Sequence, residues 1–161
     1  MLALRSIFFT VLLPGTVVVW IPRMLLARDA ARAGPGPWRW AGIPLMAAGG
    51  AVLLTCIVDF ARRGRGTLAP IDPPRKLVTA GLYRYVRNPM YVGVVTTLAG
   101  EALFFGSRSL AIYAVAAWLV FHFWVVVYEE PHLEGAFGEE YEQYRAAVPR
   151  WIPRTRAQVA P

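Results

Sequence analysis

Cysteine, histidine and acidic side chains are scarce in this chain of 161 residues. The single cysteine, Cys56, lies inside an apolar run, which excludes an internal disulfide and any metal site built from several cysteines. The two histidines, His122 and His132, are 10 residues apart, which is not the spacing of a dedicated ligand pair. We therefore expect no metal site.

Charged residues are also few. They make up 17% of the chain, whereas hydrophobic residues make up 57% and aromatic residues 13%. That balance excludes an ordinary soluble domain, and the length allows a single compact unit. We expect an all-α, polytopic membrane protein that forms one membrane domain over residues 1–161, with the lipid bilayer as its partner.

Four apolar segments account for the hydrophobic excess. A bilayer core about 30 Å thick needs about 20 helical residues, so the third segment is marginal and the others suffice. The first lacks a clear cleavage site and is expected to stay as an uncleaved helix. Only Gly106-Ser107-Arg108 links the third and fourth, which predicts a tight antiparallel hairpin. The four segments are Leu4 to Leu26, Trp38 to Phe60, Met90 to about Phe105 and Ser109 to Val127.

Basic residues predict the orientation of these segments. With four helices, 12 of the 17 Lys and Arg residues fall on the side that holds both chain ends and the connection over residues 61–89. The positive-inside rule makes that side cytoplasmic. Because the net charge of +7 sets topology, we expect no nucleic-acid partner. The expected location is a bacterial or archaeal inner membrane, with the active site and a helix and tail over residues 128–161 on the cytoplasmic side.

Polar residues lie at the start of the third apolar segment and at the end of the fourth. The stretch Arg87-Asn88-Pro89-Met90-Tyr91 precedes the third segment, and Glu129-Glu130 follows the fourth, so the hairpin returns both to one level. Pro89 can begin a helix, whose free N–H groups attract a carboxylate. Adjacent carboxylates at a membrane surface need cations or hydrogen-bond donors. Either one of them binds a polar ligand or they pair with Arg84 or Arg87.

The segments flanking these motifs are expected to be ordered. Residues 76–87 combine apolar and basic side chains and predict a short amphipathic stretch of the connection that lies in the membrane interface. After Glu130 the chain continues or bends at Pro131, and then carries an apolar stripe typical of an amphipathic helix that closes the site. His122 either lines the site or is a buried, hydrogen-bonded histidine. The stripe consists of Phe137, Tyr141, Tyr144 and Val148.

The order of these motifs resembles the isoprenylcysteine carboxyl methyltransferase and phospholipid methyltransferase superfamily of integral membrane enzymes. The matching pattern is GxGT at Gly64, GLYRYxRNPMY ending at Tyr91, the hairpin, EEPxL from Glu129, FGxxYxxY from Phe137 and VPRWxP ending at Pro153. It covers more than half of the chain. A lone GxG or Glu-Glu is weak evidence, whereas the joint order and spacing are specific.

The resemblance implies S-adenosylmethionine as methyl donor, with S-adenosylhomocysteine as product. The candidate catalytic residues are Arg87, Asn88 and Tyr91. The candidate cofactor-binding residues are Gly64, Gly66, Arg87, Pro89, Tyr91, Tyr128, Glu129 and Glu130. Asn88 stands where the carboxyl methyltransferase branch has histidine, and an amide cannot act as a base near neutral pH.

Two functions follow. One is methyl transfer to a lipid or lipophilic acceptor at the cytoplasmic interface, with a prenylated thiol carboxylate, a phospholipid amine, or a small thiol or phenol as acceptor. The other is a non-catalytic membrane scaffold or small carrier that keeps the hairpin. The joint presence of Arg87, Asn88, Tyr91 and Glu129-Glu130 favours the enzyme. The sequence leaves the acceptor and the oligomeric state open.

Overall fold

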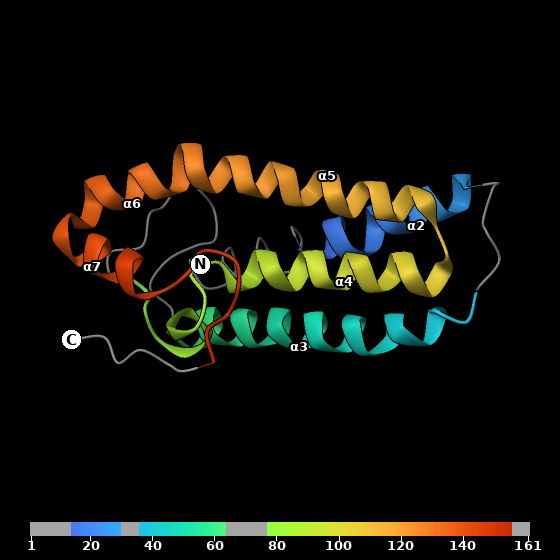
Figure 1. Ribbon diagram of the computed structural model, residues 1–161, viewed down its shortest axis with the longest axis horizontal. Coiled ribbons are helices and arrows are strands. Elements are labelled where there is room, and N and C mark those ends of the chain that lie inside the picture. Colours follow the sequence, from blue (N-terminus) through green and yellow to red (C-terminus); the bar gives the residue numbers. More distant parts are fainter. Residues whose placement is uncertain (1–13, 30–35, 64–76, 156–161) are drawn as a thin grey trace.

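The computed structural model describes residues 14–29, 36–63 and 77–155, and this part of the chain is helical without a strand (Figure 1). The predicted all-α class is confirmed. The elements in chain order are the π turn η1 (Thr16–Trp20), α2 (Ile21–Arg28), α3 (Arg39–Arg63), the 3₁₀ turn η2 (Gly81–Arg84), α4 (Pro89–Phe105), α5 (Arg108–Trp124), the π turn η3 (Val125–Glu129), α6 (Glu130–Phe137) and α7 (Glu139–Ala147).

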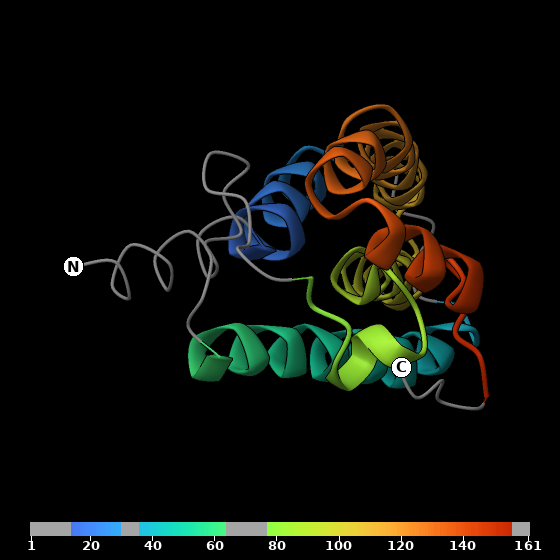
Figure 2. The same ribbon diagram turned by 90° about the vertical axis from the view of Figure 1, so that its left-hand side faces the viewer.

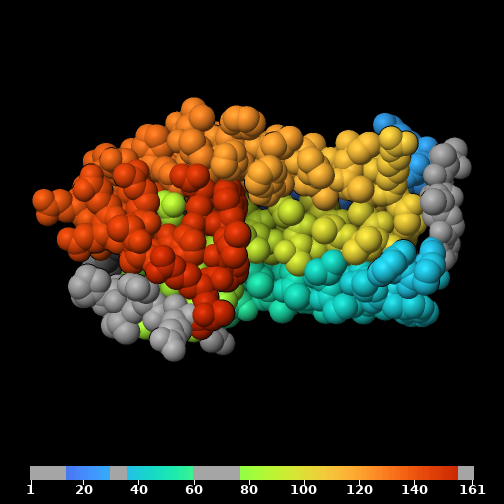
Figure 3. All heavy atoms as spheres, in the orientation of Figure 1, coloured from blue at the N-terminus to red at the C-terminus, as the bar shows by residue number. Residues whose placement is uncertain are grey.

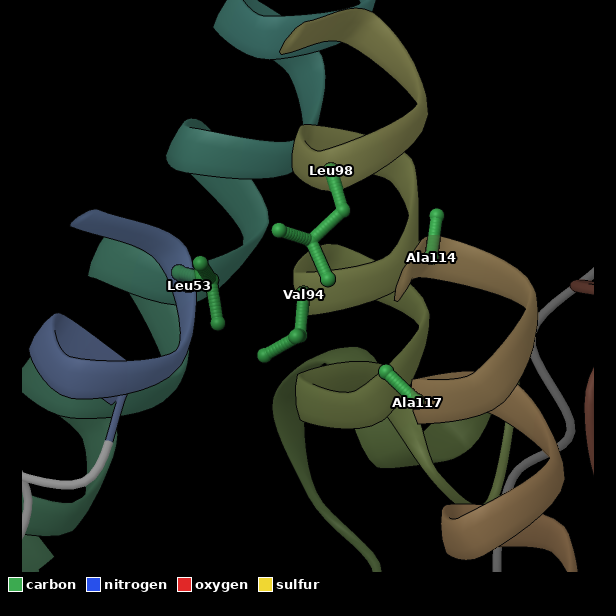
Figure 4. Packing of buried hydrophobic residues seen from close by; sticks show 5 residues of the cluster. All are labelled: Leu53, Val94, Leu98, Ala114 and Ala117. Atoms are coloured by element: carbon green, nitrogen blue, oxygen red, sulfur yellow. The ribbon is translucent and has the colours of Figure 1, made fainter. Parts of the chain in front are cut away.

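Helix α4 occupies the centre of the bundle. Figures 1 and 2 show α3 on one side of it, α5 on the opposite side, α2 on a third side and the carboxy-terminal helices at one end. The core between these helices is apolar, and its alanines, Ala114 and Ala117, let α5 approach α4 closely (Figure 4). The remaining buried members are Leu53, Val94 and Leu98.

Glycines set the distance between α3 and α4. A Cβ added at Gly49 would collide with the side chain and backbone of Thr97, and one added at Gly42 would lie 2.5 Å from the carbonyl oxygen of Gly100. The two helices therefore pack backbone against backbone. By contrast, a Cβ at Gly50 would meet nothing within 4 Å.

The link between α4 and α5 reverses the chain within two residues. Gly106 ends α4 in the left-handed region with φ 59°, where glycine carries no Cβ penalty. Ser107 then caps α5, because its hydroxyl oxygen accepts a hydrogen bond from the Leu110 N–H at 3.2 Å. The same hydroxyl donates to Asp29 Oδ2 at 2.6 Å, which ties the end of α2 to the hairpin. The predicted antiparallel hairpin is thus present.

Two π turns precede prolines. In η3 the Glu130 N–H bonds the Val125 carbonyl, and Pro131 follows at the start of α6. In η1 the Ile21 N–H bonds the Thr16 carbonyl before Pro22. Proline has no N–H and crowds the carbonyl four residues earlier, and the wider turn removes that conflict. The chain therefore continues as helix through Pro131.

Membrane-crossing length is reached by two helices of the described residues, Arg39–Asp59 and the continuous helix Arg108–Phe137, while Pro89–Phe105 is shorter. Of the first predicted segment, Leu4 to Leu26, only the part from residue 14 is described, as η1 and α2. The count of four spans is therefore not confirmed. In the described part of the chain between α3 and α4, residues 77–88, one 3₁₀ turn, η2, is the only helical element.

Candidate ligand site

The hairpin brings the two polar motifs together at one end of the bundle. Arg87 immediately precedes α4, and Glu130 opens α6 after α5 and η3. Arg87 Nη1 lies 3.0 Å from Glu130 Oε1, and both side chains are only 10% exposed. The contact joins positions 43 residues apart and confirms that the motifs share one level.

Glu130 is held by a second guanidinium. Arg150 Nε donates to Glu130 Oε1 at 2.6 Å and Arg150 Nη2 donates to Oε2 at 2.8 Å, a bidentate pair. The hydrogen bond to Glu130 raises the pKa of Arg150 above its ordinary value. A buried carboxylate needs good geometry and further hydrogen bonds to offset its desolvation, and the two guanidinium groups supply both. Arg87 Nη1 also donates to the Tyr141 hydroxyl at 3.2 Å.

Glu129 has a different environment. The Tyr91 hydroxyl donates to Glu129 Oε2 at 3.2 Å, and within the described residues Glu129 makes no ion pair. The Tyr91 ring stacks on Phe121 with 4.7 Å between centroids, which fixes its orientation. The two adjacent carboxylates therefore face unlike partners, one a phenol and the other two guanidinium groups.

Asn88 and Pro89 are buried at the start of α4. Pro89 stands at the first position of the helix, as predicted. The Asn88 amide donates from Nδ2 to the carbonyl oxygen of Arg150 at 3.2 Å, so it holds backbone of the carboxy-terminal segment. Its role in catalysis remains a prediction.

Tyr128 lies apart from this cluster. Its side chain is exposed, and its ring packs against Trp124 at 4.5 Å and against His132 at 5.9 Å. Within the described residues no hydrogen bond joins it to Tyr91 or Glu129. Its role in cofactor binding stays a prediction.

Sequence reasoning missed the contributions of the carboxy-terminal segment. Arg150 belongs to the VPRWxP motif, but its distance along the sequence from Glu130 does not indicate the bidentate ion pair between them. Trp151 donates from its indole nitrogen to His122 Nδ1 at 3.2 Å, so His122 is hydrogen-bonded but only half-buried. The Tyr144 hydroxyl donates to the carbonyl oxygen of Tyr83 at 2.8 Å. Burial raises the pKa of Tyr144, which keeps that hydroxyl a donor.

Two predicted residues, Gly64 and Gly66, lie outside the described residues. Among the side chains that are described, no group of three or more His, Cys, Asp and Glu could hold a metal ion. The polar groups gathered at this end are guanidinium, carboxylate, amide and phenol. They are suited to recognising a zwitterionic or hydroxylated ligand by charge-assisted hydrogen bonds.

An all-helical bundle with a polar site at one end of apolar helices is an architecture typical of membrane-associated proteins. Within that class, the chain belongs to the phospholipid methyltransferase family, whose model matches residues 38–140. The match begins at the start of α3 and includes both motifs of the site. The predicted superfamily membership is confirmed.

Similar proteins carry methyltransferase names. The chain is 40% identical over 78 residues to the protein-S-isoprenylcysteine O-methyltransferase of Schizosaccharomyces pombe, a segment that covers 48% of the chain and 33% of that relative. It is 35% identical over 86 residues to the methanethiol S-methyltransferase of Crocosphaera subtropica, covering 50% of the chain and 30% of the relative. Protein-S-isoprenylcysteine O-methyltransferase B of Arabidopsis thaliana is 33% identical over 79 residues, covering 48% and 40%. The matched segments thus span 30–40% of the length of these relatives.

Proposed function

We propose that this protein transfers a methyl group from S-adenosylmethionine to a lipophilic acceptor at the cytoplasmic face of a membrane. The observation that carries the proposal is the meeting of Arg87 and Tyr91, at the start of α4, with Glu129 and Glu130 beyond α5. The relatives support the reaction class, since one is named for an isoprenylcysteine substrate and another for methanethiol. Both names give a sulfur-containing substrate, which is methylated at oxygen in the first case and at sulfur in the second.

The residues present fit an amino-acid-bearing donor. Arg87 Nε is buried without a hydrogen-bond partner in the described part of the chain, which leaves a charged N–H for a carboxylate. Glu129 has one oxygen free of hydrogen bonds there, which suits an ammonium or ribose hydroxyl. The rings of Tyr91, Trp124 and Tyr128 offer faces that attract a cation. When bound, S-adenosylmethionine supplies an electrophilic methyl group on a sulfonium.

Positioning and desolvation account for the catalytic work of the chain's own residues. Transfer of a methyl group to a thiolate or another soft nucleophile needs little acid or base assistance. Asn88 cannot act as a base, and it holds the Arg150 carbonyl instead. If the acceptor is an amine, Glu129 is the carboxylate with an open oxygen that could take its proton.

The apolar helices support placement in a bilayer. Exposed apolar side chains cover the outer face of α5 and include Val115, Leu119 and Phe123, which is unfavourable in water and suited to lipid. The site lies at the end of α5 that carries Glu129 and Glu130, beyond the apolar run. An acceptor dissolved in the membrane could then approach without crossing an aqueous phase.

Binding of S-adenosylhomocysteine to purified protein in detergent or lipid tests the proposal. We expect saturable binding, weakened about tenfold or more by Glu129→Gln, because a hydrogen bond to a charged group contributes about 1.5–3 kcal/mol. Glu134→Gln is the matched control, since Glu134 forms only an exposed pair with Arg145 at 3.1 Å. Labelled donor and a membrane extract would then identify the acceptor. Absence of binding by the wild-type protein would favour a scaffold or carrier instead.

A further inference from the structure

The residues after α7 cross the open end of the site. We call Val148–Arg154 the carboxy-terminal strap. Its backbone is bound on the α4 side, where the Arg87 N–H bonds the Pro149 carbonyl at 2.9 Å and the Arg154 N–H bonds the Tyr85 carbonyl at 3.0 Å. In the space-filling view this end of the molecule is covered by the carboxy-terminal residues (Figure 3).

On the α5 side, the strap is bound through side chains. The Trp151 indole reaches His122 on α5, and Arg150 reaches Glu130 at the start of α6. The strap therefore bridges the two walls of the site. None of these bonds is local in sequence, since the Arg150 to Glu130 pair spans 20 residues and the Trp151 to His122 pair spans 29.

The hydrogen-bonding capacity of Glu130 is largely taken up by protein. Its Oε1 receives Arg150 Nε and lies 3.0 Å from Arg87 Nη1, and its Oε2 receives Arg150 Nη2. With 10% of the side chain exposed, little surface remains for a ligand. Glu129 keeps one oxygen free of protein partners in the described chain. The adjacent carboxylates are thus inequivalent.

We propose that Arg150 is a positioning residue of the ligand site: it holds Glu130, and Glu130 in turn holds Arg87, so that Glu129 is the carboxylate that contacts the ligand. The inference rests on the proposed function. Arg87 is the link to the ligand because its Nε is buried and without a partner in the described residues. A guanidinium fixed at Nη1 by Glu130 and Tyr141 presents that Nε in one direction.

A double-mutant cycle on S-adenosylhomocysteine affinity tests the chain of contacts. We expect Arg150→Ala and Glu130→Gln each to weaken binding about tenfold. The double variant should bind no more weakly than the more affected single variant, because coupled residues act as a unit. Arg150→Lys should rescue binding only in part, since an ammonium cannot reproduce the fork. Additive losses would mean that Arg150 contacts the ligand itself and would overturn the proposal. Arg145→Ala is the matched control, because its pair with Glu134 is exposed.

Hydrogen exchange of the ligand-free protein separates this inference from the proposed function. We expect Arg150→Ala and Glu130→Gln to speed exchange at the Arg87 and Arg154 amides, which bond across the strap, while Arg145→Ala leaves them unchanged. Unchanged exchange in the first two variants would overturn the positioning role even if the ligand binds. Faster exchange in these two variants, together with no binding of S-adenosylhomocysteine by the wild-type protein, would uphold the contacts and reject the proposed function, and with it the assignment of Glu129.

Discussion

At the scale of single residues, the main result is that neighbouring side chains of the same type have separate environments. Glu129 meets a tyrosine hydroxyl, whereas Glu130 meets two guanidinium groups. Within the described residues, the partner of Glu129 lies in α4. The two partners of Glu130 lie immediately before α4 and in the carboxy-terminal strap. A buried carboxylate with two cationic partners is costly to disturb, because removal of one side leaves an uncompensated charge.

Asn88→Asp tests the bond that ties the strap to α4. An ionised carboxylate cannot donate to the Arg150 carbonyl, and it adds negative charge to a buried position near Glu130. We expect the free energy of unfolding to fall by about 1–3 kcal/mol. Thermal unfolding of the purified protein in detergent measures the change.

Gln143→Glu provides the control for that experiment. Gln143 is exposed on α7, so the same amide-to-carboxylate change there should leave the midpoint of unfolding nearly unaltered. Equal midpoints for Asn88→Asp and the wild type would show that the amide contact does not hold the strap.

At the scale of elements, the seam between α3 and α4 is the most sensitive contact. Gly49→Ala places a methyl group against Thr97, and overpacking of this kind costs about 1–3 kcal/mol. Gly50→Ala adds the same methyl group to the next residue of the same helix, where nothing lies within 4 Å. We expect the first variant to unfold at lower temperature and the second to match or exceed the wild type, because alanine favours helix over glycine.

Equal behaviour of the two variants would contradict the backbone contact between α3 and α4. The comparison is internally matched, since both substitutions add one carbon atom to neighbouring glycines. Circular dichroism should in addition retain its helical signal for both, because neither position has a φ that disfavours alanine.

The helices of this fold could be predicted from sequence because long apolar runs and turn residues are local signals. Met90 to Phe105 and Ser109 to Val127 correspond closely to α4 and to α5 with most of η3. The π turns could not be predicted, since they arise where helical continuity competes with the missing N–H of Pro22 and Pro131.

The site was predictable in part. Arg87 and Glu130 were expected at the same level because a tight hairpin returns the chain there, and an ion pair with Arg84 or Arg87 was one of two alternatives for the acidic pair. The structure shows the pair of Arg87 with Glu130. The contacts of Arg150 and Trp151 with the site could not be predicted. Both residues lie in an irregular segment, and its path depends on how α7 packs through Tyr141. Periodicity carries no information about such a path.

At the scale of the whole molecule, the two ends of the hairpin determine how the bundle would sit in a bilayer. The hairpin loop at Gly106-Ser107-Arg108 and the site lie at opposite ends of α4 and α5 (Figure 1). If these helices cross the membrane, then Arg108 and Arg145 face opposite aqueous phases.

Single cysteines provide the test of that arrangement. In a Cys56→Ala background, Arg145→Cys should react with an impermeant maleimide in vesicles that expose the cytoplasmic face, and Arg108→Cys in vesicles of the opposite orientation. Cys56 is fully buried and is replaced only to remove background labelling. Labelling of both positions from one side would contradict a membrane-crossing hairpin.

The π turn η3 has a consequence for how this helix can vary in length. A π turn holds one residue more than the α-helical turn it replaces, so Val125–Glu129 amounts to a built-in insertion. Deletion of Val127, which is 71% exposed, would let a regular α-helical turn replace the π turn without loss of a buried contact. Because both kinds of turn complete about one revolution, Glu130 would still face Arg87. The extra residue therefore lengthens this helix without changing the direction in which the acidic pair faces.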